Sequence, residues 1–286
     1  MRYGNVEDSV VCQGEFLQIN GLKEALQGIT DNIDTFEFKN VTIDALPEDL
    51  FCEMQNATLK KIIFSYSSVE LLNAPLNANS PFKSVEDTLE SLEIYDSSSV
   101  FAWNISILTS LKKLTTFIVE NSEFFEMKAL FGKFTTLKFV QFVSANIKWI
   151  HPQAFKNNKN LSICSLSNNY ISHVERSMFP KPAMHLWSLD LSFNKIKSLP
   201  ADMFDAMPSL QELKLDNNHL KRFQIHLISS VWNRLTQLWL DGNEVLCWPF
   251  CWVVGKQHRP LFLDSSKCTL GRSSELILDS FYPFCT

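Results

Sequence analysis

Four cysteines near the carboxyl end are the residues whose type and spacing most directly suggest chemistry. Thiols grouped in this way form disulfides in an oxidising compartment or hold a zinc ion. The zinc alternative would use Cys247, Cys251, Cys268 and His258, but the first pair is spaced C-x3-C and no second C-x-x-C follows. The spacing therefore favours disulfides among Cys247, Cys251, Cys268 and Cys285 over a metal site.

Three aspartates form a second candidate, because Asp190, Asp216 and Asp241 recur at nearly regular intervals. Stacked carboxylates could share a proton or bind a cation. The nearby Lys214 favours a simpler interpretation, in which these side chains form a solvated acidic strip.

Catalytic motifs are missing from the sequence, which contains no G-x-S-x-G, H-E-x-x-H, G-x-x-x-x-G-K-[ST] or G-x-G-x-x-G. The six histidines are scattered and are interpreted as solvated or locally bonded surface residues: His151, His173, His185, His219, His226 and His258. We expect a protein that is not an enzyme and needs no metal or cofactor.

The elements that position these residues are copies of one repeat. In LWSLDLSFNKIKSLPADMF (186–204) the apolar residues follow the frame L-x-x-L-x-L-x-x-N-x-I, which recurs nine times at steps of 23 to 30 residues. Nine copies in one register predict a solenoid in which each repeat stacks on its neighbours. The copies begin at residues 33, 59, 89, 114, 137, 161, 186, 210 and 235.

Each copy predicts a short strand followed by a turn. Its third to seventh residues alternate in polarity, which is the period of a strand with one buried face. An asparagine at the ninth place can satisfy backbone groups at the turn, because its side chain both donates and accepts hydrogen bonds. The later copies have Asn169, Asn194, Asn218 and Asn243, whereas the earlier turns must be closed differently, around Val41, Ser67, Ser97, Ser122 and Ala145.

The second half of each copy sends an apolar side chain back toward the core. It is usually phenylalanine, which explains much of the load of 23 Phe. Aromatic residues that recur with the repeat predict a buried spine and not a ligand box. Its members are Phe51, Phe131, Phe155, Phe179 and Phe204, with Ile228 in the next copy.

Composition narrows the classes of partner. The chain is 45% apolar and 20% charged, with a net charge of −5, so it can bury a continuous core. We expect no nucleic-acid or anionic membrane partner, because no cluster of Lys and Arg is long enough. The longest apolar run near the end, LCWPFCWVV, is too short to span a bilayer.

Glycosylation signals and cysteines together predict an extracellular or secreted glycoprotein. Asn-x-Ser/Thr triplets occur at Asn40, Asn56, Asn104 and Asn160. The first ten residues, MRYGNVEDSV, lack the apolar core of a signal peptide, so we interpret the sequence as a mature chain or a fragment.

Three further cysteines have separate interpretations. Cys12 and Cys52 either pair across the first turn, or Cys12 ends an amino-terminal cap whose other cysteines are missing. Cys164 stands at a buried place of its repeat and is interpreted as a core thiol without a partner.

The repeat frame resembles the extracellular leucine-rich repeat superfamily from about residue 16 to residue 245. The resemblance implies an α/β fold: a right-handed curved solenoid with a parallel concave β-sheet and a disulfide-stapled carboxy-terminal cap. It divides the chain into an incomplete amino-terminal cap (1–32), nine repeats (33–245) and a cysteine-rich cap (246–286). The family pattern implies the pairs Cys247–Cys268 and Cys251–Cys285, although that cap usually has C-x-C where this chain has C-x3-C.

A second resemblance involves residues 10–51 and the stretch EDTLESLEI (86–94). They look like secreted arthropod leucine-rich proteins that are similar to the non-catalytic subunit of the shrimp (Oplophorus-type) luciferase complex. This resemblance implies a secreted, receptor-like scaffold without light-emitting chemistry.

Function is therefore expected on a surface. The third, fifth and seventh residues of each strand point away from the core and form the concave face. Most are polar, but the middle copies are apolar, which is typical of a binding site for a protein or glycan-bearing ligand. The predicted partner-binding residues are Tyr95, Ile118, Phe139, Gln141, Val143, Ile163 and Asp190, with Trp239 as a second anchor.

Two alternatives stay open at this point. A strand register shifted by one residue would bury the apolar side chains. The protein could also be a structural accessory subunit of a secreted complex, docking through its convex face or a cap. The sequence leaves the oligomeric state undetermined.

Overall fold

The computed structural model describes residues 9–14, 19–29, 33–54, 58–71, 80–98, 100–263, 266–270 and 275–285. The chain divides into two compact units, Met1–Phe125 (unit 1) and Glu126–Thr286 (unit 2). The boundary falls inside the predicted repeat array, between the copies that begin at residues 114 and 137.

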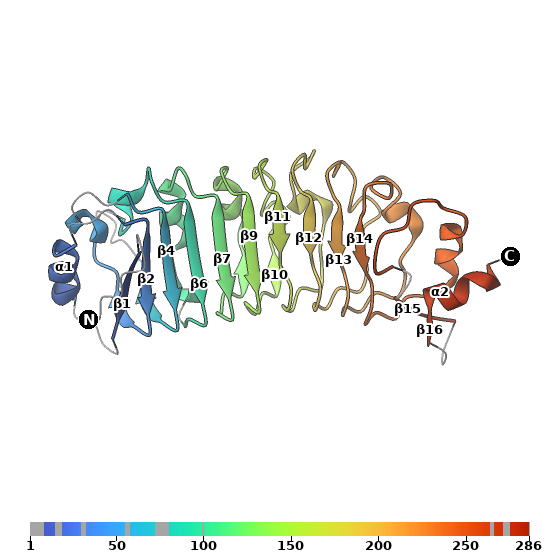
Figure 1. Cartoon of the computed structure of the whole chain (residues 1–286), viewed down its shortest axis with the longest axis horizontal. Helices are drawn as coiled ribbons and strands as arrows, with labels where there is room; N and C mark the ends of the chain where they lie inside the picture. Colours follow the sequence, from blue (N-terminus) through green and yellow to red (C-terminus); the bar gives the residue numbers. More distant parts are fainter. Residues whose placement is uncertain are drawn as a thin grey trace. The chain divides into compact units, whose positions relative to one another are not determined.

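Unit 1 is built on a parallel sheet whose strands follow the chain order (Figure 1). The third place of one frame pairs with the third place of the next, as in Thr35 with Lys61 and Ser91 with Thr116. The strands are β1 (Ser9–Gln13), β2 (Thr35–Lys39), β4 (Lys61–Ser65), β6 (Ser91–Tyr95) and β7 (Thr116–Glu120). A second, two-stranded sheet contains β3 (Thr42–Ala45) and β5 (Ser68–Leu71).

Unit 2 repeats the arrangement with shorter strands. Its parallel sheet contains β9 (Phe139–Val143), β11 (Ile163–Ser165), β12 (Ser188–Asp190), β13 (Glu212–Lys214) and β14 (Gln237–Trp239). Two smaller sheets pair β8 (Glu126–Met127) with β10 (Trp149–Ile150), and β15 (Lys267–Thr269) with β16 (Glu275–Ile277).

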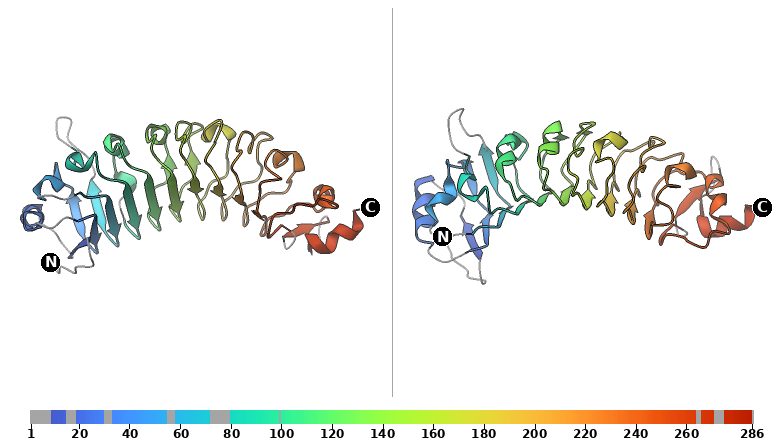
Figure 2. Two further views of the ribbon diagram at one scale, coloured as in Figure 1. Left: turned by 45° about the horizontal axis from the view of Figure 1, so that its top comes forward. Right: turned by 90° about the horizontal axis from the view of Figure 1, so that it is seen from above.

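The strands are joined mainly by turns and short 3-10 helices, which both views in Figure 2 show. The α-helices of the described residues are α1 (Ile19–Gln27) and α2 (Leu278–Phe281). The 3-10 helices are Leu50–Glu53, Lys83–Val85, Val100–Ala102, Ile105–Ser110, Ala129–Lys133, Arg176–Met178, Ile225–Leu227, Trp248–Val253 and Tyr282–Phe284.

Burial along the strands follows the predicted alternation. In β9, Val140 and Phe142 are fully buried while Phe139 is 42% exposed. Burial in β2 and β7 alternates in the same register. The shifted register is therefore wrong, because it would have exposed the second set and buried the first.

Buried asparagines tie the repeats of unit 2 together. Asn194 donates to the carbonyl oxygens of Leu166 in the preceding repeat and Ser192 in its own, at 2.8 and 3.0 Å. Its Oδ1 accepts from the backbone N–H of Ile171 at 3.0 Å. Asn169, Asn218 and Asn243 reach back one repeat in the same way. This ladder satisfies backbone groups that the turns would leave unpaired.

Serines take the same place in the last three frames of unit 1, whereas the first frame has Val41 there. The Ser97 hydroxyl accepts from the backbone N–H of Ser67 at 3.1 Å and donates to the carbonyl of Tyr95 at 2.8 Å. Ser67 accepts from Val41 N–H, and Ser122 accepts from Ser97 N–H. A hydroxyl has one proton to donate whereas a carboxamide has two, so each serine rung makes fewer bonds.

The predicted phenylalanine spine is present in unit 2. Phe131, Phe155 and Phe179 are buried, and successive ring centroids lie 6.1 and 6.0 Å apart. Phe204 and Ile228 are also buried in the following repeats. The rings fill the space between the strands and the outer turns and form a continuous core.

Two disulfides staple the carboxyl end of unit 2. Cys247 is bonded to Cys268 and Cys251 to Cys285, which is the pairing that the resemblance implies. The zinc alternative is wrong, because its three cysteines are all oxidised. Among the described residues no group of three or more His, Cys, Asp or Glu side chains is arranged to hold a metal ion.

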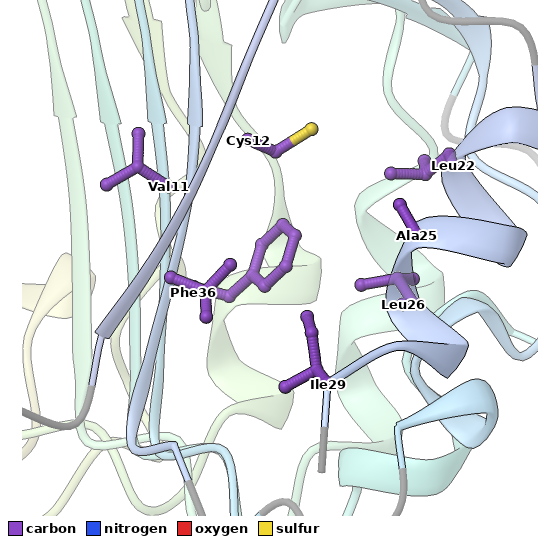
Figure 3. Close-up of a pocket in the computed structure, with 8 residues that line it drawn as sticks. Val11, Cys12, Leu22, Ala25, Leu26, Ile29 and Phe36 are labelled. Carbon is purple, nitrogen blue, oxygen red and sulfur yellow. The ribbon is translucent and has the colours of Figure 1, made fainter. Parts of the chain in front are cut away.

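The amino-terminal end of unit 1 is closed by α1. Leu22, Leu26 and Ile29 lie on one side of this segment and face Cys12 and Phe36 (Figure 3). The space left between them is only about 10 Å³. Helix and strands therefore pack closely, and the end of the sheet is covered by apolar side chains.

The pairing of Cys12 with Cys52 is wrong. Both are free thiols: Cys12 is buried beneath α1, whereas Cys52 is exposed on the 3-10 helix Leu50–Glu53. Burial raises the pKa of Cys12 to about 11. Cys164 is a free thiol with no exposed surface, as expected for a core residue, and burial raises its pKa.

Candidate functional site

The candidate site is an apolar area on the strand face of unit 2. We call it the Phe139 patch and define it as Phe139, Gln141, Val143 and Ile163. Phe139 begins β9 and is paired in register with Ile163 of β11, so their side chains are neighbours on one face. Gln141, Val143 and Ile163 are partly exposed. The inner residues of these strands are buried, so the core does not require the patch.

Charged residues continue this face beyond the patch. Lys214 Nζ lies 2.9 Å from Glu212 Oε1 and 3.8 Å from Asp190 Oδ2. Burial alone would lower the pKa of Lys214, but the hydrogen bond to Glu212 and the surrounding carboxylates raise it overall. Burial raises the pKa of Asp216. The strip is therefore a cluster of ion pairs around one ammonium group.

Trp239 contacts two other side chains on this face. Its ring stacks on Phe262, with centroids 4.6 Å apart and planes 15° from parallel. Lys214 Nζ lies 5.0 Å from the centroid of the same ring. Because Phe262 covers one side of Trp239, this end of the face presents the aromatic pair, of which Phe262 is 47% exposed.

Tyr95 and Ile118 belong to unit 1, whereas Phe139, Val143 and Ile163 belong to unit 2. Tyr95 Oη donates to Glu93 Oε2 at 2.9 Å, and burial followed by this bond raises the pKa of Tyr95. Glu93 also binds Lys61 at 2.8 Å and is 7% exposed. Tyr95 therefore lies in a polar network and not in an apolar area.

Phe193 is an exposed aromatic residue with a strained backbone, and the repeat pattern did not identify it. The eighth place of each of the nine frames has positive φ, between 47° and 69°. Asparagine, aspartate and glycine tolerate this conformation, but bulky side chains do not. Phe193 adopts it with φ 52° and remains 53% exposed. An aromatic residue there costs stability, and the mismatch between residue and position was visible in the sequence.

Replacing Phe193 with asparagine is expected to raise the free energy of unfolding by about 1 kcal/mol, because asparagine tolerates the left-handed conformation. Chemical denaturation followed by tryptophan fluorescence would measure the change. Phe193→Ala is the matched control, since alanine keeps the Cβ clash and should give no gain. Equal stabilisation by both substitutions would show that exposure and not backbone strain is responsible.

Comparison with known proteins adds to this geometry. Residues 184–245 match the family model described as leucine rich repeat. A stretch of 66 residues is 35% identical to Podocan of Mus musculus and covers 23% of this chain and 10% of that protein. The repeats, the ladder of buried asparagines and these matches all indicate the same fold. The fold is that of a leucine-rich repeat solenoid.

Two solved leucine-rich repeat structures show how far the fold extends. The TLR13–ssRNA13 complex superposes with a TM-score of 0.66 and 21% identity, over 92% of this chain and 35% of that chain. A chain of the octameric complex of Latrophilin 3, Unc5D and FLRT2 (LRR) gives a TM-score of 0.57 and 17% identity, over 77% and 71%. This chain thus spans about a third of the TLR13 chain. Leucine-rich repeats are scaffolds typical of protein–protein interaction.

Three of the four predicted glycosylation sites lie in the described part of the leucine-rich repeat solenoid. Asn40, Asn104 and Asn160 are exposed, whereas Asn56 lies outside the described residues. Asn104 Oδ1 accepts from the backbone N–H and the hydroxyl of Ser106, at 3.2 and 2.6 Å. Across the described ranges no helix has the length and apolarity needed to cross a membrane.

Proposed function

We propose that this leucine-rich repeat protein is a secreted, non-enzymatic recognition scaffold that binds a partner protein, or a glycan-bearing one, through the strand face of unit 2. The observation that carries the proposal is the 42% exposure of Phe139 beside the partly exposed Ile163. Exposed apolar side chains with a polar rim are the usual composition of a protein-binding site.

The rim supports a protein partner over a nucleic acid. Asp190, Glu212 and Asp216 surround the single ammonium group of Lys214 on the same face. Phosphate groups would be repelled by these carboxylates, whereas a protein can present matching cations. TLR13 was solved with single-stranded RNA and FLRT2 with Latrophilin 3 and Unc5D, and the charge of this face favours the second kind of partner.

Secretion is part of the proposal. Two disulfides in one short cap are favoured in oxidising compartments, and the exposed Asn40, Asn104 and Asn160 are accessible to glycosylation. A cytosolic solenoid would have no need for such a cap.

The double substitution Phe139→Glu with Ile163→Glu is expected to weaken partner binding at least a hundredfold, because it places two carboxylates where an apolar contact forms. The partner would first be captured from the native extracellular fluid with the unchanged protein and purified. Its affinity for each variant would then be measured by calorimetry.

Met184→Glu is the matched control, because it makes the same change at another residue of unit 2 that is 52% exposed. It should leave the affinity within about twofold, since isolated surface substitutions have small effects. Retained affinity in the double variant would remove the Phe139 patch from the proposal.

Docking through the carboxy-terminal cap, as in an accessory subunit, is the second candidate. It is favoured by Leu261 and Trp248, which are 62% and 56% exposed. The same titration with Trp248→Glu and Leu261→Glu would distinguish the two surfaces, because each candidate predicts loss of affinity in only one pair of variants.

A further inference from the structure

A pocket of about 400 Å³ lies on the segments that return between the strands of unit 2. None of its residues belongs to the strand face, so it is a separate surface from the one proposed to bind a protein. Its size is within the range of small-molecule sites. The lining residues are Gln153, Lys156, Asn157, Lys159, Arg176, Ser177, Phe179, Lys181 and Asp202.

The lining is cationic in a protein whose net charge is −5. Lys156, Lys159, Lys181 and Arg176 face a single carboxylate, Asp202. None of the ion pairs among the described residues involves these three lysines, which are all exposed. Cations gathered without carboxylate partners create a positive potential that attracts anions.

Arg176 gives the pocket a buried charge. It is 3% exposed, and its guanidinium donates only to backbone carbonyl oxygens. Nε binds Asp205 O at 2.5 Å, Nη1 binds Phe179 O at 3.3 Å, and Nη2 binds Pro180 O at 2.7 Å and Ala206 O at 3.4 Å. Those bonds use four of five N–H groups and none reaches a carboxylate, so the charges of Asp202 and Asp205 act on the guanidinium without a hydrogen bond. An anion in the pocket would add a further negative charge close to this buried cation.

Neutral polar groups beside the cations indicate the kind of anion. Gln153, Asn157 and Ser177 offer amide and hydroxyl groups that can hydrogen-bond sugar hydroxyls. Binding of single-stranded RNA normally requires exposed aromatic rings on which bases stack. The aromatic residue of this lining is Phe179, which is 2% exposed. The lining therefore suits an acidic sugar better than a nucleotide.

We propose that this pocket binds a sulfated sugar unit of an acidic polysaccharide, with Lys156, Lys159 and Lys181 contacting the sulfate groups. Arg176 holds the backbone around Phe179 and Asp205 through its hydrogen bonds, and its buried charge adds to the positive potential of the pocket. The site goes beyond the proposed protein partner and uses different residues, so either proposal can fail without the other.

A heparin oligosaccharide is the probe, and calorimetry at fixed ionic strength is the measurement. The triple variant Lys156→Gln, Lys159→Gln, Lys181→Gln should bind about tenfold more weakly, because each exposed charge pair contributes a factor of about two to three. Asp202→Asn should bind heparin about two to three times more tightly, because it removes one repelling charge. All proteins carry Asn160→Gln, so that no glycan beside Lys159 shields the pocket.

Lys138→Gln, Lys197→Gln, Lys221→Gln is the matched control, since it removes the same charge from exposed lysines outside the pocket. It should change the affinity by less than twofold. Equal weakening by both triple variants would overturn the proposal in favour of unspecific attraction. Equal binding of a desulfated oligosaccharide, or of single-stranded RNA with the same charge, would overturn the assignment to a sulfated sugar. Absence of heparin binding would overturn the site.

Discussion

Truncating Phe155 to alanine is expected to lower the free energy of unfolding of unit 2 by about 3–5 kcal/mol. Phe155 has no exposed surface and lies between Phe131 and Phe179 in the spine. Its removal would leave a cavity that two neighbouring repeats cannot fill without moving their turns. Urea unfolding followed by tryptophan fluorescence would measure the loss, because six of the seven tryptophans lie in unit 2.

Phe139→Ala serves as the control, since it makes the same truncation at a ring that is 42% exposed in the same unit. We expect a loss below about 1 kcal/mol there. Similar losses at the two positions would mean that Phe155 is not part of a close-packed spine.

Replacing Asn194 with alanine is expected to cost about 2–4 kcal/mol. The backbone N–H of Ile171 would lose its acceptor inside the core. The carbonyls of Leu166 and Leu191 would each keep one donor, from Asn169 and Asn218 respectively. The expected loss of stability therefore comes from one buried N–H without an acceptor and from carbonyl groups that each lose one of their donors. The same unfolding experiment would measure it.

Asn157→Ala provides the comparison, because Asn157 is exposed on a turn of the same unit. Its loss should be below about 0.5 kcal/mol. If Asn194→Ala were equally mild, water would have to replace the side chain, and the ladder would not be a main source of cohesion between repeats.

Much of the fold could be predicted because the repeat encodes it locally. The alternation of Val140 and Phe142 with Phe139 set the strand register, and the asparagine at the ninth place marked the turn. Both signals recur at a fixed spacing, so errors in one copy are corrected by the others. That register also predicted that Phe139 and Ile163 face away from the core, where both are at least partly exposed.

What the sequence did not predict depends on contacts without a period. Phe262 covers Trp239 because the cap folds back over the last strand, and nothing near either residue indicates this. The pocket around Arg176 combines residues from three segments that are separate in the sequence, 153–159, 176–181 and Asp202. Tyr95 was interpreted as apolar, but its hydroxyl binds Glu93, two residues away on the same strand. Such pairs require knowledge of side-chain direction and not only of spacing.

The ninth place of the repeat is mostly serine in unit 1 and mostly asparagine in unit 2, and this difference affects which repeats unfold locally first. In unit 2 the buried carboxamide of Asn194 makes four bonds across two repeats. In unit 1 the hydroxyls of Ser67 and Ser97 each make three bonds and that of Ser122 makes two. Solenoids open repeat by repeat, since each repeat is held only by its neighbours. We therefore expect the low-energy fluctuations to begin in unit 1, where the serine hydroxyls make fewer bonds. The Phe139 patch and the pocket around Arg176 lie in the unit whose rungs make more bonds, where a binding surface keeps its shape between encounters.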